Sequence, residues 1–157
     1  MKKKVTADAQ MLIRKPVPEV FQAFVDPAIT TKFWFTKSTG KLEEGKTVTW
    51  EWEMYNVKDR VIVDKLVTDK LIKITWGEPK SKVDFDFQEI GTDKTFVKIT
   101  CYDFPQKDTE LIDIIKDYTG GFTIVLDGLK AYLEHHLNLN LIEDKFPKEI
   151  SQQGNKR

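Results

Sequence analysis

The stretch TVTWEWEM, residues 47–54, places a large apolar side chain at every second position. Side chains in a β-strand alternate between its two faces, so this pattern predicts a half-buried antiparallel strand. The residues expected to share the apolar face are Val48, Trp50, Trp52 and Met54. Side chains of this size need an equally large apolar surface opposite them.

That opposing surface is predicted near the end of the chain, in FTIVLDGLKAYLEHHLNLNL, residues 122–141. Apolar residues recur there at the three- and four-residue spacing that forms one stripe along a helix. The stripe consists of Phe122, Leu126, Leu129 and Leu133. The preceding residues 108–121 also have a helical pattern, and they are predicted to form a separate short helix broken by Gly120 and Gly121.

The N-terminal segment predicts one strand followed by two short helices. Apolar residues alternate over roughly residues 5–14, and the strand is expected to end before Pro16. Pro18 suits the first turn of a helix. Asp26 is a plausible N-cap for a second helix, with Pro27 at its first position.

Four further apolar segments follow the opening stretch, separated by short turn-like connections that favour antiparallel neighbours. They are residues 60–67, 70–76, 82–90 and 95–102. A chain of 157 residues is long enough for one domain with one core. We therefore expect an α+β fold over residues 1–143, with a curved antiparallel sheet wrapped around a long C-terminal helix. The polar residues 144–157 are expected to form a frayed tail.

Composition argues against several classes of partner. Lysine plus arginine equals aspartate plus glutamate at 25 each, so there is no net field to attract nucleic acid or anionic lipid. No apolar run reaches membrane-spanning length, and the basic start MKKK is not followed by the apolar segment of a signal peptide. The single cysteine, Cys101, cannot form an intramolecular disulfide. These features favour a cytoplasmic soluble protein.

The sequence offers no clear catalytic or metal site. His135 and His136 are the only histidines, and adjacent residues on a helix diverge by about 100°, so they cannot readily share one metal. Cys101 has no base nearby in sequence and is interpreted as a small buried hydrophobe. No phosphate loop, nucleophile elbow or paired-cysteine motif occurs, so no cofactor is expected.

Several polar or aromatic residues have two interpretations. Acidic residues of the predicted strands alternate with apolar ones, which places them on a solvated convex face and leaves no inward acid–base pair. They are Glu51, Glu53, Asp84 and Asp86. Lys65 interrupts an apolar face and either reaches the cavity mouth or extends its amine to water. The aromatic run FWF, residues 33–35, either packs plainly in the core or, because three consecutive aromatics on a helix cannot all face one core, places at least one ring at the cavity entrance, with Trp34 among the expected lining residues.

Three motifs resemble the family homologous to the activator of the heat-shock protein 90 ATPase, which has the START-like, or helix-grip, fold. They are PVPEVFQAFVDPAITTKFW, LIKITW and GGFTIVLDGLKAYLEHH. The resemblance covers roughly residues 8–137. Phe122 stands where the family usually has tryptophan, which bears on the identity of a ligand.

The resemblance implies a cavity between the sheet and the last helix, and hence binding of a small apolar or amphipathic ligand. Its expected lining is Trp34, Trp50, Trp52, Trp76, Phe87, Val97, Phe122, Leu126 and Leu129. Two alternatives remain: an interaction module with a filled core and a chaperone partner, or an enzyme of the polyketide cyclase or dehydratase type. A void of about 300 Å³ or more under the last helix favours binding, whereas tight packing favours the interaction module.

Overall fold

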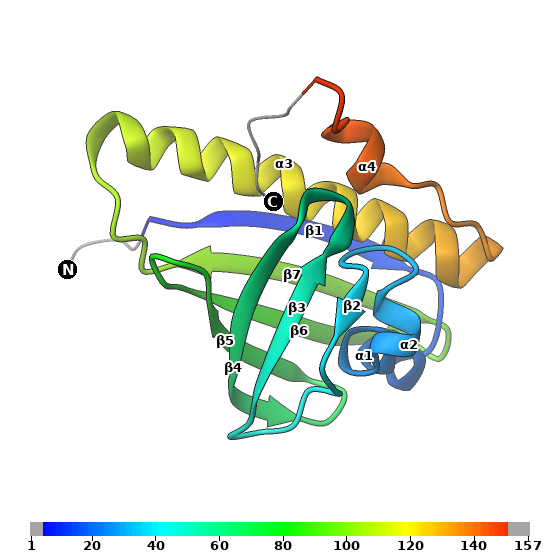
Figure 1. Ribbon diagram of the computed structural model, residues 1–157. Coiled ribbons are helices and arrows are strands. Elements are labelled where there is room, and N and C mark those ends of the chain that lie inside the picture. The colour runs from blue at the N-terminus through cyan, green and yellow to red at the C-terminus, as the bar shows by residue number, and fades with distance from the viewer. Residues whose placement is uncertain (1–4, 151–157) are drawn as a thin grey trace.

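Seven antiparallel strands form one curved sheet in the computed structural model, which describes residues 5–150 (Figure 1). Their order across the sheet is β1-β7-β6-β5-β4-β3-β2. The strands are β1 (Ala7–Ile13), β2 (Lys37–Ser38), β3 (Thr47–Trp52), β4 (Val57–Val67), β5 (Leu71–Trp76), β6 (Ser81–Gly91) and β7 (Lys94–Tyr102). In Figure 1, β3 and β4 cross in front of the middle of the sheet, which shows how strongly it curls.

The helices of the described residues are α1 (Val17–Val25), α2 (Pro27–Thr30), the 3-10 helix η1 (Glu53–Tyr55), α3 (Asp108–His135) and α4 (Leu141–Lys145). α1, α2 and α3 lie where the sequence predicts helical structure, whereas η1 and α4 were not predicted. Asp26 caps α2 as predicted, because its carboxylate accepts a hydrogen bond from the Ala28 N–H at 3.0 Å. The predicted helix-grip architecture, with two short helices after the first strand and a long helix packed on the sheet, is confirmed.

The apolar stripe of α3 meets the apolar face of the sheet in one continuous core. Phe122, Leu126 and Leu129 are buried in the same cluster as Trp50 and Trp52. The helix and the tryptophan strand belong to the same core, and Trp34 links them, since its ring packs against both Trp50 and Phe122. Burial of each such side chain contributes about 1.5–3 kcal/mol, so this core accounts for much of the stability of the fold.

The helix predicted to break at two glycines is continuous. α3 runs through Gly120 and Gly121 without interruption. A glycine inside a helix costs only about 1 kcal/mol relative to alanine, and the burial of the apolar stripe outweighs that cost. α3 also has a polar anchor at its far end, where Lys130 Nζ donates hydrogen bonds to the Leu12 carbonyl at 2.9 Å and to Glu134 at 2.8 Å.

The tryptophan strand is shorter than predicted. β3 ends at Trp52, and Met54 lies in η1, where it is only partly buried. The backbone turns here because Asn56 adopts the left-handed conformation, with φ of 55°, which asparagine tolerates better than most residues. Met54 therefore does not continue the inward face of the strand.

A β-bulge decides the position of Lys65. The register of β4 and β5 shifts between Val63 and Lys65, and beyond it Leu66, rather than Lys65, pairs with the buried Ile72. An extra residue in one strand reverses the side-chain alternation beyond it. Lys65 is consequently exposed, which agrees with a lysine that extends its amine to water.

The aromatic run 33–35 is entirely buried, which agrees with packing in the core. Its backbone is not the short helix that was assumed, because α2 ends at Thr30 and the run forms an irregular turn. Phe33 packs directly against α3 at Gly128, where a Cβ atom would lie only 3.1 Å from the Phe33 Cβ.

The C-terminal segment is more ordered than predicted. α4 extends to Lys145, and Phe146 packs against the core, although the polar tail was expected to fray from residue 144. One aromatic ring and one buried isoleucine, Ile142, supply the apolar contacts that the lack of a helical period obscured. Residues 151–157 lie outside the described part of the chain.

Candidate functional site

A cavity of about 210 Å³ lies between the sheet and α3. Its floor comes from β3, β4 and β5, its roof from α3, and one end is closed by α4 and the residue that follows it. The exposed Glu78 and Pro79, in the turn after β5, lie on its rim. The volume is below the 300 Å³ at the lower end of drug-sized pockets, so the cavity suits only a small molecule.

Four of the nine residues predicted from the sequence line this cavity. They are Trp34, Trp52, Trp76 and Phe122. The other five, Trp50, Phe87, Val97, Leu126 and Leu129, are buried in the core but do not line it. The cavity thus occupies one end of the surface that the sequence assigned to it.

Stacking by a neighbouring ring explains why Trp50 is not exposed to the cavity. The Phe35 ring stacks on Trp50 with 4.5 Å between ring centroids and 19° between planes. The Trp34 ring lies 4.9 Å from Trp50 on centroids. These two rings come from the irregular turn after α2, and they fill the space above Trp50 that the cavity would otherwise occupy.

Two residues that line the cavity have a buried polar atom without a hydrogen-bond partner among the described residues, Trp52 at Nε1 and Gln106 at Oε1. The indole of Trp76 instead interacts with the buried thiol of Cys101. An unsatisfied buried donor or acceptor costs about 1–3 kcal/mol, and native proteins contain few of them. Both atoms are enclosed by the surrounding packing and do not open onto the cavity.

An inward-facing carboxylate, Asp59, was missed by the sequence analysis. Asp59 pairs directly with Trp50 across β3 and β4, and partners in an antiparallel pair share a face of the sheet. Its side chain therefore lies on the concave face, where it is half-buried and lines the cavity. The sequence pattern that could have revealed it is the two-residue spacing of Val57, Asp59 and Val61, which places all three on one face of a strand. The side chains of Val57 and Val61 pack against the core.

A hydrogen bond from Tyr55 holds in place the segment that closes one end of the cavity. Its hydroxyl donates a hydrogen bond to the Phe146 carbonyl at 2.6 Å and lies 3.2 Å from the Ile142 carbonyl. Phe146 and Ile142 both line the cavity. The contact thus joins η1 to the segment around α4, two parts of the chain that are far apart in the sequence.

A second hollow of about 290 Å³ lies beyond the first, between the turn after α2 and the segment that joins α3 to α4. Trp34 and Ile142 line both spaces. The second hollow is edged by polar groups of that segment, including Asn138 and Asn140. The second hollow adds free space beside Trp34, whereas Trp52 and Trp76 do not line it.

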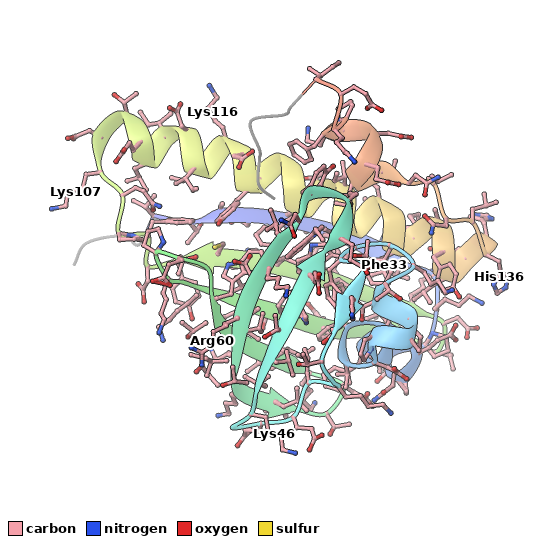
Figure 2. All side chains as sticks on the ribbon, in the orientation of Figure 1. Phe33, Lys46, Arg60, Lys107, Lys116 and His136 are labelled. Atoms are coloured by element: carbon pink, nitrogen blue, oxygen red, sulfur yellow. The ribbon has the colours of Figure 1, made fainter. Side chains whose placement is uncertain are left out.

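The remaining candidates for chemistry lie away from the cavity. His136 caps the C-terminus of α3, and Figure 2 shows it and Lys107 at opposite ends of that helix. Cys101 is completely buried, and burial raises the pKa of its thiol to about 12. Over residues 5–150, no three histidine, cysteine, aspartate or glutamate side chains gather to hold a metal ion.

Within residues 5–150, no helix combines the length and the apolar character that spanning a membrane requires.

Comparisons with known proteins agree with this architecture. The family described as "Activator of Hsp90 ATPase homolog 1-like protein" matches residues 14–134. A solved structure of protein SSP2350 from Staphylococcus saprophyticus is 31% identical, with a TM-score of 0.75, over 86% of this chain and 96% of that one. A comparison with curated protein sequences gives no match.

Two more distant structures share the fold. The Aha1 dimer from Colwellia psychrerythraea is 18% identical, with a TM-score of 0.69, over 83% of this chain and 97% of that one. A START superfamily protein from Mycobacterium smegmatis is 10% identical, with a TM-score of 0.62, over 82% of this chain and 98% of that one. Both structures show that this chain has the START-like fold.

Proposed function

The chain belongs to the family of activator of Hsp90 ATPase homolog 1-like proteins, and on that premise we propose that it binds a small apolar or amphipathic molecule between its sheet and α3. The observation that carries the proposal is a cavity of about 210 Å³ between the sheet and α3, lined by the aromatic rings of Trp34, Trp52, Trp76, Tyr118 and Phe122. Ligand pockets are typically concave and lined by apolar and aromatic side chains.

An interaction module with a filled core is the alternative, and two observations favour it. The cavity of about 210 Å³ is smaller than the roughly 300 Å³ that was expected to favour binding. Five of the nine predicted lining residues are packed in the core without facing the cavity. A protein of that type would bind a partner, for example a chaperone, through its outer surface. It would bind no small molecule under α3.

A matched pair of glycine substitutions tests the proposal. Gly121 lines the cavity, and a Cβ atom added there meets nothing within 4 Å. Gly120 lies next to it in α3, and a Cβ atom there would touch only the Lys145 side chain at 3.5 Å or more. Both changes to alanine should stabilise the helix by about 0.5–1 kcal/mol.

The two variants should differ in binding. We expect 4-phenylbutanol, a small neutral probe, to bind the unaltered protein saturably, measured as a change in tryptophan emission. Gly121→Ala should weaken binding about threefold, equivalent to about 0.6 kcal/mol, because the added methyl group enters the cavity. Gly120→Ala should bind as the unaltered protein does. Absence of saturable binding to the unaltered protein would favour the filled interaction module.

A further inference from the structure

Two neighbouring hollows meet at α4, and each of them is small by itself. The cavity between the sheet and α3 has a volume of about 210 Å³, and the second hollow has about 290 Å³. Ligand pockets begin at roughly 300 Å³, which each hollow alone falls short of and the two together exceed. The size of ligand that the protein accepts therefore depends on the boundary between them.

Three segments of the chain pass from one hollow to the other. On α3, Val125 lines the cavity and Gly128, nearly one turn further along, lines the second hollow. On α4, Leu141 lines the second hollow alone, whereas Ile142 lines both. Of the described residues that line these spaces, only Trp34 and Ile142 border both. These two residues therefore form the boundary.

Trp34 is the fixed side of the boundary. Its ring lies 4.9–6.4 Å, between centroids, from six other aromatic rings. They are Phe24, Phe35, Trp50, Trp76, Phe85 and Phe122. Side chains in a close-packed core cannot shift without disturbing their neighbours, so this side of the boundary does not adapt to a ligand.

Ile142 is the adjustable side of the boundary. It belongs to a helix of five residues, of which it is the single buried one. Its neighbours Glu143 and Asp144 are exposed, and the Tyr55 hydroxyl lies 3.2 Å from its carbonyl oxygen. Removal of its side chain would leave that backbone contact and the rings around Trp34 in place. The space opened would join the cavity to the second hollow.

We propose that Ile142 sets the maximum length of the ligand. With isoleucine at this position, the ligand is a short molecule confined to the aromatic cavity under α3. A smaller residue would admit a longer apolar chain, which would extend past Trp34 into the second hollow. This inference rests on the proposed function, because it assigns the residue that selects among ligands of the same cavity by their length.

A series of neutral probes that differ only in chain length separates the inference from the proposed function. The series is 4-phenylbutanol, 6-phenylhexanol and 8-phenyloctanol, with binding measured as a change in tryptophan emission. The unaltered protein should bind the two longer alcohols within about twofold of the affinity for 4-phenylbutanol, because their added methylene groups stay in water. Each methylene group that is buried would instead raise the affinity about fourfold.

Ile142→Ala tests the assigned residue. The variant should bind 6-phenylhexanol about tenfold more tightly than the unaltered protein does, because the added methylene groups are buried in the joined space. Its affinity for 4-phenylbutanol should stay within about threefold of the original value. The control is Leu141→Ala, which removes the same number of carbon atoms from the same helix and lines the second hollow alone. It should keep the original limit on length.

The outcomes are distinct. An affinity that rises steadily with chain length in the unaltered protein would overturn the inference and leave the proposed function intact. So would a folded Ile142→Ala variant that gains nothing for 6-phenylhexanol, or an equal gain in Leu141→Ala. Absence of saturable binding of all three alcohols to the unaltered protein would count against the proposed function itself. If Ile142→Ala does not fold, Ile142→Val should give a gain of about twofold, and an unchanged affinity would overturn the inference.

Discussion

The Tyr55 hydroxyl donates a 2.6 Å hydrogen bond to the carbonyl of Phe146, 91 residues further along the chain. This bond holds the segment after α4 against η1, at the end of the cavity where Ile142 and Phe146 form the wall. A single hydroxyl group therefore links the C-terminal segment to the sheet side of the candidate site.

Replacement of Tyr55 with phenylalanine should loosen this segment without disturbing the core. We expect a loss of about 1 kcal/mol in the free energy of unfolding, because the hydrogen bond is removed while the ring remains. Limited proteolysis should cut the chain faster between residues 137 and 150. Tyr132→Phe, on α3, is the control and should leave the rate of cleavage unchanged. Equal rates for the two variants would show that the bond does not hold the segment.

Replacement of each β3 tryptophan with alanine should distinguish a residue of the cavity wall from a residue of the packed core. Trp50→Ala removes a ring stacked on Phe35 and should cost the roughly 3–5 kcal/mol typical of a large aromatic truncated in a packed core. Trp52→Ala should cost about 1–2 kcal/mol less, because Trp52 borders existing free space and its N–H lacks a partner. Chemical denaturation followed by far-UV circular dichroism measures both values. A full penalty at both positions would indicate that Trp52 is ordinary core.

The thiol of Cys101 should be inert in the folded protein. It is completely buried, and burial raises its pKa to about 12, so almost no thiolate exists at pH 8. We expect no reaction with a disulfide reagent over hours in buffer and one equivalent of reaction in denaturant. Rapid labelling of the native protein would mean that the sheet opens near β7.

Glu134 should contribute stability that depends on pH. Burial raises the pKa of Glu134, but hydrogen bonds from the Arg14 N–H and the Lys130 ammonium outweigh it and lower the pKa below 4.5. A lowered folded-state pKa means that the contribution is complete above the unfolded-state pKa and is lost as the pH falls through the folded-state pKa.

Glu134→Gln should therefore lower the free energy of unfolding by about 1 kcal/mol at pH 7 and by much less near pH 3. Urea denaturation at the two pH values measures the difference. Glu89→Gln, at an exposed position of β6, should change neither value appreciably. The same loss at both pH values would mean that the charge of Glu134 contributes nothing.

The sequence predicted the sheet, its meander and the helix that covers it, because each depends on local periodicity. It predicted the inward direction of Trp50 and Trp52 correctly for the same reason. It could not show that only Trp52 borders free space. That difference depends on Phe35, which reaches Trp50 from an irregular turn whose path no local pattern describes.

Local exceptions account for the other differences. The bulge beside Lys65 reverses the side-chain alternation in mid-strand, and Gly120 and Gly121 are tolerated in α3 because tertiary packing outweighs their helix propensity. In contrast, the inward direction of the Asp59 side chain could have been predicted from the sequence. β4 begins at Val57, three residues before the predicted strand, and an earlier start would have placed Asp59 on the inward face.

The two ends of α3 are fixed to the sheet very unequally. Near the C-terminus, Lys130 and Glu134 tie the helix to β1, and Gly128 lets Phe33 approach the helix backbone closely. Residues 108–113 are almost all exposed, and the glycine pair that follows is the weakest point of the helix. The N-terminal half is held by apolar packing instead, since Ile115 and Tyr118 contact the core and the Tyr118 ring lies 6.0 Å from that of Trp76. The roof of the cavity therefore has polar anchors at one end and only apolar side-chain contacts beside the cavity itself.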